Sequence, residues 1–252
     1  MKYKVAIFDL DGTILDTIDD LADTMNECLR KYQMPERSLD EIRSFVGNGI
    51  HKLVERAVQE RTEPVVVERM FATFHEYYKE HCAIKTKPYE GIEAVLEQLR
   101  DHGVKTAVVS NKADYAVKSL CETYFNGFFD YMAGEKAGQR RKPYPDSVNA
   151  VMEYFGAEPQ EVVYIGDSEV DYQTAQNVGI DVIMVGWGFR EEAFLRSVGA
   201  KKVIHCPEEI ISEMETDELL NEYEKRKSAE TILPHIQMEI EQSIPQKRCN
   251  KE

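Results

Sequence analysis

The sequence predicts an α/β protein with a Rossmann-like parallel-sheet core and an inserted all-α domain. Apolar runs of strand length occur near the start of the chain and again after residue 91, where they alternate with helical patterns. This alternation is typical of right-handed crossovers in a parallel sheet. Between the first run and residue 85 the pattern is helical only, which indicates a separate helical unit.

The first strand is predicted at residues 5–8, a short apolar run that suits a strand buried on both faces. A helical stretch follows, from about Asp16 to Ile84. Two apolar helical faces support it, one made of Leu21, Ala22, Met25, Cys28 and Leu29, and one made of Val54, Ala57 and Val58.

The core resumes after Gly91 with strands predicted at residues 105–109, at residues 162–165 and up to Val185. Gly179 suits the end of a helix, because glycine adopts the left-handed conformation that often closes one. A crossover helix is predicted before the second strand, from the shared apolar face of Ile92, Val95, Leu96 and Leu99.

These elements divide the chain into three parts. The α/β core comprises residues 1–15 and 86–211, and the helical domain comprises residues 16–85. Chain crossings near Asp16 and at residues 85–89 are the expected hinges. Residues 212–252 are predicted to form a helical or partly disordered extension, because they are rich in Glu, Lys and Gln and contain two prolines that would interrupt a long helix.

Composition limits the partners of the protein. The net charge of -15 over 252 residues argues against non-specific binding of nucleic acid or of an acidic membrane. No apolar run approaches the length of a membrane span, so a cytoplasmic protein is predicted. A monomer or homodimer is expected. The five cysteines lack C-x-x-C spacing and are expected to be reduced thiols.

Two aspartates, Asp9 and Asp11, follow the first predicted strand directly. Residues at the carboxyl ends of parallel strands line the crevice where open α/β sheets bind ligands, and residues two apart on an extended chain face the same side. Gly12 would then let the chain turn away. One carboxylate could attack phosphorus while the other handles a proton. A solvated turn is the alternative interpretation of this fragment alone.

Three further segments place polar residues at strand ends or before helices. Ser110 and Asn111 follow the second strand, Lys142 lies in a proline-bearing polar loop, and Asp167 and Asp171 follow the third strand. In order and spacing, these segments and the Asp9 segment resemble the four signature motifs of the haloacid dehalogenase-like phosphohydrolase superfamily. The helical insertion after the first motif resembles the cap domain of one of its subfamilies.

This resemblance implies a role for each acidic residue. Asp9 would be the nucleophile that forms an aspartyl-phosphate, and Asp11 the general acid/base. Mg²⁺ would be held by Asp9, by the backbone carbonyl of Asp11 and by Asp167, with Asp171 in the outer shell. For Asp171, a carboxylate that only favours a helix N-terminus is the simpler alternative.

The remaining motif residues would bind the phosphoryl group. Ser110 and Asn111 would donate hydrogen bonds, Lys142 would offset charge, and Gly12 would belong to the loop around the group. Helix capping is an alternative or additional role for Ser110 and Asn111, and a surface position is the alternative for Lys142.

Within the helical insertion, residues 43–50 resemble the cap loop of phosphoglycolate phosphatases. Arg43 is a candidate partner for a substrate carboxylate, and the backbone near Gly47 and Asn48 would approach a small anionic group. A simple helix–helix turn is an equally good interpretation of this segment.

The function implied by the resemblance is a Mg²⁺-dependent phosphatase. It would hydrolyse a small phosphorylated metabolite through an aspartyl-phosphate, with 2-phosphoglycolate as the expected substrate. Alternatives on the same scaffold are a pyrophosphatase, a phosphomutase that isomerises sugar phosphates, and a binding protein without catalysis. Retention of all four motifs speaks against the last.

Overall fold

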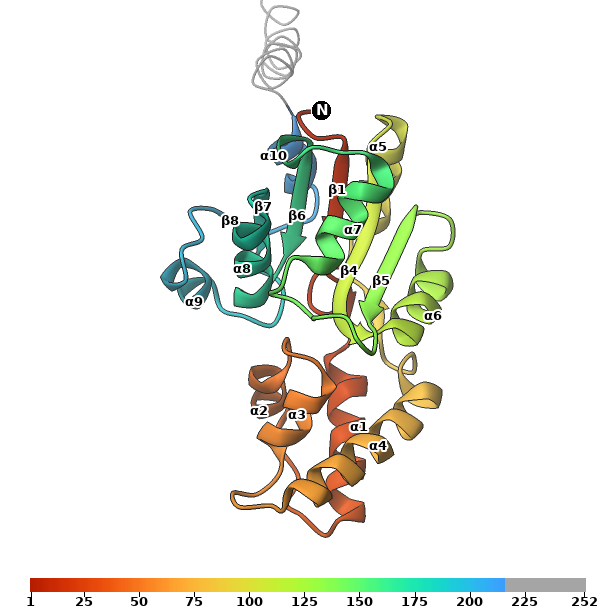
Figure 1. Cartoon of the computed structure of the whole chain (residues 1–252), viewed down its shortest axis with the longest axis vertical. Helices are drawn as coiled ribbons and strands as arrows, with labels where there is room; N and C mark the ends of the chain where they lie inside the picture. The colour runs from red at the N-terminus through yellow and green to blue at the C-terminus, as the bar shows by residue number, and fades with distance from the viewer. Residues whose placement is uncertain (216–252) are drawn as a thin grey trace, which may run out of the picture. The chain divides into compact units, whose positions relative to one another are not determined.

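A six-stranded parallel sheet forms the centre of the computed structural model, which describes residues 1–215 (Figure 1). The strand order is β5-β4-β1-β6-β7-β8. The bounds are β1 Val5–Phe8, β4 Lys105–Ala113, β5 Tyr131–Glu135, β6 Val162–Gly166, β7 Asp181–Val185 and β8 Val203–Ile204. This sheet confirms the predicted α/β class with a Rossmann-like parallel core.

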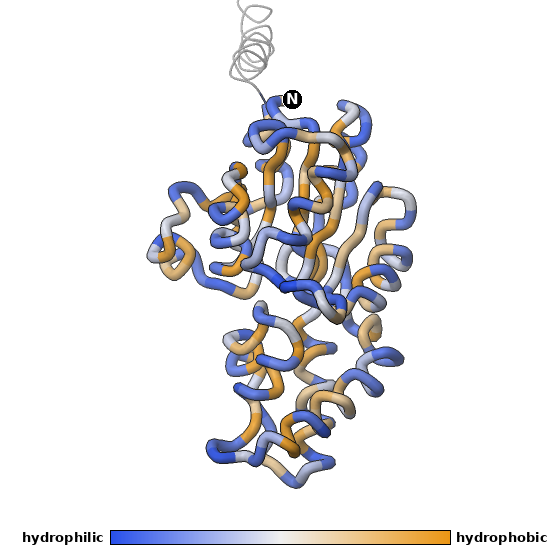
Figure 2. Tube along the Cα trace, viewed as in Figure 1, coloured by the Kyte–Doolittle hydropathy of each residue, from blue (hydrophilic) through white to orange (hydrophobic). Residues whose placement is uncertain are grey.

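Strand β1 lies between β4 and β6, with Phe8 opposite Val108 and Ile165. Its successive side chains point to opposite faces of the sheet. Ala6 and Phe8 join one buried apolar cluster and Val5 and Ile7 join another. The strand is therefore buried on both faces, which is why it consists only of apolar residues, and Figure 2 shows the sheet as a hydrophobic centre.

Helices cover both faces of this sheet. Buried residues of α5, α6 and α10 belong to the cluster of Phe8, whereas those of α7 and α8 belong to the cluster of Ile7. Gly179 ends α8 with a φ of 82°, as the sequence predicts. The bounds are α5 Ile92–Asp101, α6 Asp114–Tyr124, α7 Asp146–Phe155, α8 Glu169–Val178, α9 Glu192–Ser197 and α10 Glu209–Met214, with a 3-10 turn, η1, at Pro159–Glu161.

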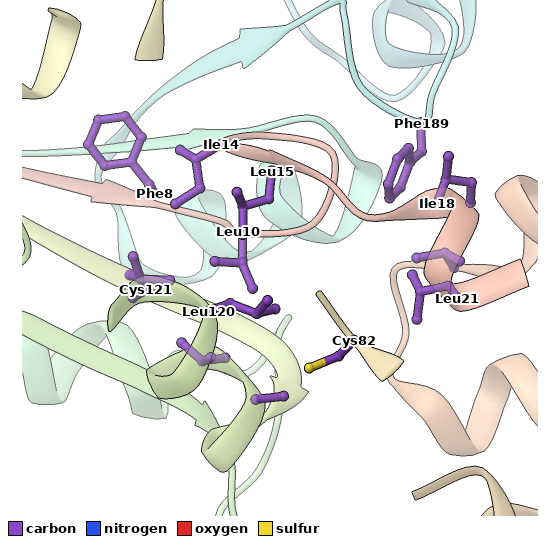
Figure 3. Packing of buried hydrophobic residues seen from close by; sticks show 14 of the residues in the cluster. Phe8, Leu10, Ile14, Leu15, Ile18, Leu21, Cys82, Leu120, Cys121 and Phe189 are labelled. Carbon is purple, nitrogen blue, oxygen red and sulfur yellow. The ribbon is translucent and has the colours of Figure 1, made fainter. Parts of the chain in front are cut away.

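The insertion between β1 and α5 is helical, as predicted. It consists of α1 Ile18–Lys31, α2 Leu39–Phe45, α3 Ile50–Ala57 and α4 Pro64–His81. We call these four helices the cap. Figure 3 shows that the apolar cluster continues from Phe8 and Leu10 of the core to Ile18 and Leu21 of α1. Core and cap therefore share one continuous set of apolar contacts.

The two chain crossings pair with each other. Strand β2, Leu15–Asp16, is antiparallel to β3, Lys87–Pro88. Next to them, the buried carboxylate of Asp20 accepts hydrogen bonds from the backbone N–H groups of residues 84–86 and from the Thr86 hydroxyl. Strands this short show no periodicity, so the sequence analysis did not predict them.

Two boundaries differ from the sequence-based expectation. Strand β4 runs to Ala113 instead of Val109, with a register shift between these two residues, so Ser110 and Asn111 lie within its end. The core extends to Met214 instead of residue 211, because α10 packs in the main apolar cluster. The rest of the predicted extension, residues 216–252, lies outside the described residues.

Within residues 1–215, four cysteines are free thiols and three of them are buried, as predicted. Cys249 lies outside this range. No helix in the described part of the chain is both long and apolar enough to cross a membrane.

Candidate active site

A cavity at the carboxyl ends of β1, β4 and β6 contains most of the predicted site residues. Because these strands are neighbours in the sheet, the motifs that follow them converge there although they are far apart in sequence. The predicted residues that line the cavity are Asp9, Asp11, Gly47, Ser110, Asn111 and Asp167.

Lys142 is buried and contacts Asp9, which lines this cavity. Its Nζ donates hydrogen bonds to Asp171 Oδ1 at 2.7 Å and to the Tyr164 hydroxyl at 2.8 Å, and it lies 2.9 Å from Asp9 Oδ1. Burial alone would lower the pKa of Lys142, but the charges of Asp171 and Asp9 outweigh it and raise the pKa well above the ordinary value. Lys142 is therefore a fixed positive charge at the site.

The side chain of Asp9 accepts fewer hydrogen bonds than those of Asp11, Asp167 and Asp171. Its carboxylate is buried, and Oδ1 has no partner with hydrogen-bond geometry among the described residues, despite the nearby ammonium of Lys142. Burial raises the pKa of Asp9 to about 6, while Lys142 opposes this rise. Apart from this ion pair with Lys142, no donor among the described residues holds Oδ1, so the carboxylate is available to a further cation or to a phosphorus atom.

The carboxylates of Asp9, Asp167 and Asp171 form a buried acidic cluster whose oxygens lie within 4.8 Å of one another. Burial, together with the charges of Asp171 and Asp9, raises the pKa of Asp167 well above its ordinary value. Adjacent buried carboxylates repel each other unless a cation neutralises them. Lys142 pairs with Asp9 and Asp171 but not with Asp167. Mg²⁺ prefers such oxygen ligands, so the carboxylates of Asp9 and Asp167 fit the predicted magnesium ion.

The three carboxylates are not equally available. Asp171 accepts a hydrogen bond at Oδ1 from Lys142, and at Oδ2 it accepts from the backbone and side chain of Ser168, at 3.1 and 2.6 Å. Asp167 accepts at Oδ2 from the backbone of Phe189 at 2.7 Å. The many partners of Asp171 are consistent with the predicted outer-shell position.

Gly12 is required by the packing around Asp167. Its φ is +83°, and an added Cβ would lie 2.4 Å from Asp167 Oδ2. We expect Gly12→Ala to lower stability by about 1–3 kcal/mol and to reduce turnover, because Asp167 must move. Urea unfolding and a phosphatase assay would measure both effects. Gly127→Ala is the matched control, since Gly127 has a φ of +80° but nothing within 4 Å of an added Cβ.

Asp11 is held by Thr17, at the start of cap helix α1, and by Lys112, on core strand β4. Its Oδ1 accepts hydrogen bonds from Thr17 Oγ1 at 2.6 Å and from Lys112 Nζ at 2.8 Å. Lys112 also donates to the hydroxyl of Tyr78, on α4, at 2.7 Å. Burial would lower the pKa of Lys112, but Asp11 and Tyr78 outweigh it and the net change is a rise. The sequence analysis missed Lys112 and Tyr78.

The loop between α2 and α3 lies against the core. Asn111 Nδ2 donates to the carbonyl oxygen of Gly47 at 3.2 Å. Arg190, which follows β7, donates to the carbonyl oxygens of Val46 and Arg43 at 2.6 and 3.0 Å and pairs with Glu169 at 2.9 Å. Arg190 was also not predicted from the sequence, because a single arginine in a loop does not form a recognisable motif.

Two predicted cap residues do not reach the cavity with their side chains. The Arg43 guanidinium pairs with Asp40, one turn earlier on α2, at 3.0 Å, and lines a different cavity beside Trp187. Asn48 is not among the residues that line the cavity of Asp9. Of the predicted cap residues, the structure brings only Gly47 to that cavity.

Comparison with known proteins agrees with this geometry. Residues 6–185 match the model of the haloacid dehalogenase-like hydrolase family. The chain belongs to that family. The family match and the phosphatase relatives below make it a phosphoric monoester hydrolase, as the sequence predicts.

Several relatives are phosphoglycolate phosphatases. The enzyme of Aquifex aeolicus is 30% identical over 187 residues, which cover 74% of this chain and 86% of that protein. The enzyme of Caulobacter vibrioides is 31% identical over 202 residues, which cover 79% and 85%. A solved structure from Lactobacillus delbrueckii subsp. bulgaricus, provisionally named a phosphoglycolate phosphatase, is 38% identical with a TM-score of 0.81, covering 85% of this chain and 99% of that one.

Proposed function

We propose that this chain is a Mg²⁺-dependent phosphatase that hydrolyses a small phosphomonoester, 2-phosphoglycolate, through an aspartyl-phosphate on Asp9. The observation that carries the proposal is the buried Asp9 carboxylate, whose Oδ1 is 2.9 Å from the fixed charge of Lys142 and which lies in one acidic cluster with Asp167. A buried carboxylate in this setting is suited to attack phosphorus.

The proposed reaction has two steps. In the first, an Asp9 oxygen bonds to phosphorus, the bond to the leaving oxygen breaks, and Asp11 gives that oxygen a proton. In the second, Asp11 takes a proton from water, the water oxygen bonds to phosphorus, and the bond from phosphorus to Asp9 breaks. Phosphate is released and both aspartates return to their starting states.

The other residues hold the transferring group. Lys142 offsets its negative charge, and Ser110 and Asn111 line the cavity where its oxygens would lie. A bound Mg²⁺, held by Asp9, Asp167 and the Asp11 carbonyl, would supply further neutralisation of phosphate charge. Asp171 keeps Lys142 in place through their 2.7 Å ion pair.

The cap side of the cavity favours a small substrate with an anionic end. On this side Leu21, Val46, Ile50 and Leu53 form apolar walls, while Lys112 and Arg190 line the cavity from the core and carry positive charge. We propose that the helical domain, residues 16–85, which contains the cap, opens and closes over this cavity about the β2–β3 pairing to admit substrate and release product. The names of the relatives support 2-phosphoglycolate as the substrate.

Phosphate release from a substrate panel tests the proposal. The panel contains 2-phosphoglycolate, pyrophosphate and several sugar phosphates, each assayed with Mg²⁺ and with chelator. We expect Mg²⁺-dependent release with a strong preference for 2-phosphoglycolate. Preference for pyrophosphate or a sugar phosphate would reject the substrate, and isomerisation of a sugar phosphate without net release would indicate a phosphomutase instead.

Mg²⁺ is expected to raise the melting temperature of the metal-free protein, and to do so more at pH 8 than at pH 5. The pKa of Asp9 is raised from 3.8 to about 6, so the metal-free folded state gains a proton, and stability, as pH falls through this range. Protons and Mg²⁺ therefore compete for the same carboxylates. At about 100 times its Kd, Mg²⁺ would add about 2.7 kcal/mol at pH 8.

Differential scanning calorimetry with matched ionic strength would measure this shift. Asp167→Asn is the control variant, because it removes a proposed ligand and should suppress the Mg²⁺-dependent part. An equal shift in wild type and Asp167→Asn would contradict the proposed metal site. We also infer a cytoplasmic location. We infer a monomeric or homodimeric state as well, and a native mass measurement would test this oligomeric state.

A further inference from the structure

Lys112 occupies an unusual position for a lysine. Its side chain is only 1% exposed, yet it lies beside the cavity and not on the protein surface. Its ammonium contacts two groups, Asp11 Oδ1 at 2.8 Å and the Tyr78 hydroxyl at 2.7 Å, and it lies 4.7 Å from the centre of the Tyr78 ring. A buried ammonium is costly unless it is paired, so these contacts define where Lys112 can lie.

The two partners of Lys112 belong to different parts of the protein. Asp11 follows β1 in the core, and Tyr78 is a fully buried residue of the cap helix α4. Lys112 itself lies on β4, next to the proposed phosphate-binding residues Ser110 and Asn111. One ammonium thus connects the proposed general acid/base to the cap.

We propose that Lys112 is a positioning residue for Asp11, and that Tyr78 makes this positioning depend on the closed cap. This inference rests on the proposed function. Lys112 and Thr17 both donate to the same oxygen of Asp11, at 2.8 and 2.6 Å, which fixes the carboxylate from two directions. Movement of α4 away from the core would remove Tyr78 from Lys112 and leave the ammonium less constrained.

A positioning role predicts a selective kinetic defect. The value of kcat/KM reports the steps up to release of the leaving group, which is where Asp11 donates its proton. A poor leaving group, such as an alkoxide, needs that proton, whereas p-nitrophenolate leaves readily without it. A misplaced Asp11 should therefore lower kcat/KM for the hydrolysis of alkyl phosphates much more than kcat/KM for p-nitrophenyl phosphate.

The experiment compares kcat/KM of wild type, Lys112→Met and Tyr78→Phe on three substrates. These are ethyl phosphate, 2-phosphoglycolate and p-nitrophenyl phosphate. For Lys112→Met we expect a loss of roughly 10- to 100-fold on both alkyl phosphates and of less than about threefold on the aryl phosphate. Tyr78→Phe, which loses only one hydroxyl and should fold, is expected to show the same pattern with a smaller loss, roughly 3- to 10-fold.

Lys118→Met is the matched control, because Lys118 is about half exposed on α6 and, among residues 1–215, pairs only with Asp114. It should leave all three values unchanged. Circular dichroism would verify the fold of each variant, and Tyr78→Phe alone decides the question if Lys112→Met does not fold.

Each other outcome overturns the inference. An equal loss on all three substrates, or no loss, would show that Lys112 does not act through Asp11. A loss confined to 2-phosphoglycolate would show that Lys112 binds the substrate carboxylate instead. Wild-type protein that releases phosphate from none of the three would reject the proposed function itself, which is a separate failure.

Discussion

Asp9→Asn is expected to abolish turnover, by at least about 10⁴-fold, while the protein stays folded. The substitution keeps the volume of the side chain but replaces the attacking oxygen with an amide. No other carboxylate takes its place, because Asp171 is committed to Lys142 and Ser168, and Asp167 accepts from the backbone of Phe189. Steady-state release of phosphate from the best substrate of the panel would measure the loss.

The same variant should be more stable than the wild type when metal is absent. Since burial raises the pKa of Asp9 to about 6, the ionised carboxylate destabilises the folded state above that pH, and asparagine removes this charge. The gain is expected to be about 1–3 kcal/mol at pH 8 and to vanish near pH 4, where Asp9 is protonated anyway.

Urea unfolding at the two pH values would measure this gain. Asp101→Asn, at an exposed position on α5, is the control for the loss of one negative charge from an acidic protein. Turnover by Asp9→Asn within about tenfold of wild type would contradict the assignment of the nucleophile. A loss of turnover together with a loss of stability would indicate a structural role for Asp9.

The residues that sequence alone could place are those that follow core strands. Asp9 and Asp167 directly follow β1 and β6, and Ser110 directly follows the apolar run of β4, residues 105–109, within that strand. Once the runs are taken as neighbouring parallel strands, convergence of the motifs follows from sheet geometry. Lys142 could be placed by its motif but its partner Tyr164 could not, because a tyrosine within an apolar strand carries no sign of a polar contact.

The site residues that could not be predicted from the sequence are those that form contacts between the core and the helical insertion. Tyr78 is one of several aromatic residues on α4, and only the packing of α4 on the core brings its hydroxyl to Lys112. Arg190 donates to backbone carbonyl oxygens of Arg43 and Val46. Every residue has a backbone carbonyl, so such contacts produce no recognisable pattern in the sequence. The Arg43 guanidinium pairs with Asp40, one turn away on the same helix, at an exposed position, and it lines a different cavity from that of Asp9.

Lys142→Met is expected to cost both activity and stability. Removal of one partner of a buried ion pair typically costs about 3–5 kcal/mol, and here the loss leaves Asp9 and Asp171 without their shared cation. Turnover should fall by at least about 10³-fold, because the charge that offsets the transferring phosphoryl group is gone. Urea unfolding and phosphate release would measure the two effects.

The stability loss should depend on pH in a defined direction. Lys142 opposes the rise in the pKa of Asp9, so without it the folded-state pKa rises further above the unfolded value. A carboxyl group with a raised folded pKa weakens the protein as pH increases through that value. The variant is therefore expected to be much less stable than wild type at pH 8 and to recover part of the difference at pH 5.

Two further variants separate charge from geometry. Lys142→Arg keeps a cation and should retain much of the stability, but its planar guanidinium cannot reproduce the short contacts to Asp171, Tyr164 and Asp9, so turnover should stay low. Lys201→Met, at an exposed position, controls for the loss of a positive charge. Full stability of Lys142→Met at pH 8 would mean that the buried carboxylates do not depend on this lysine, and the electrostatic account of the site would have to be abandoned.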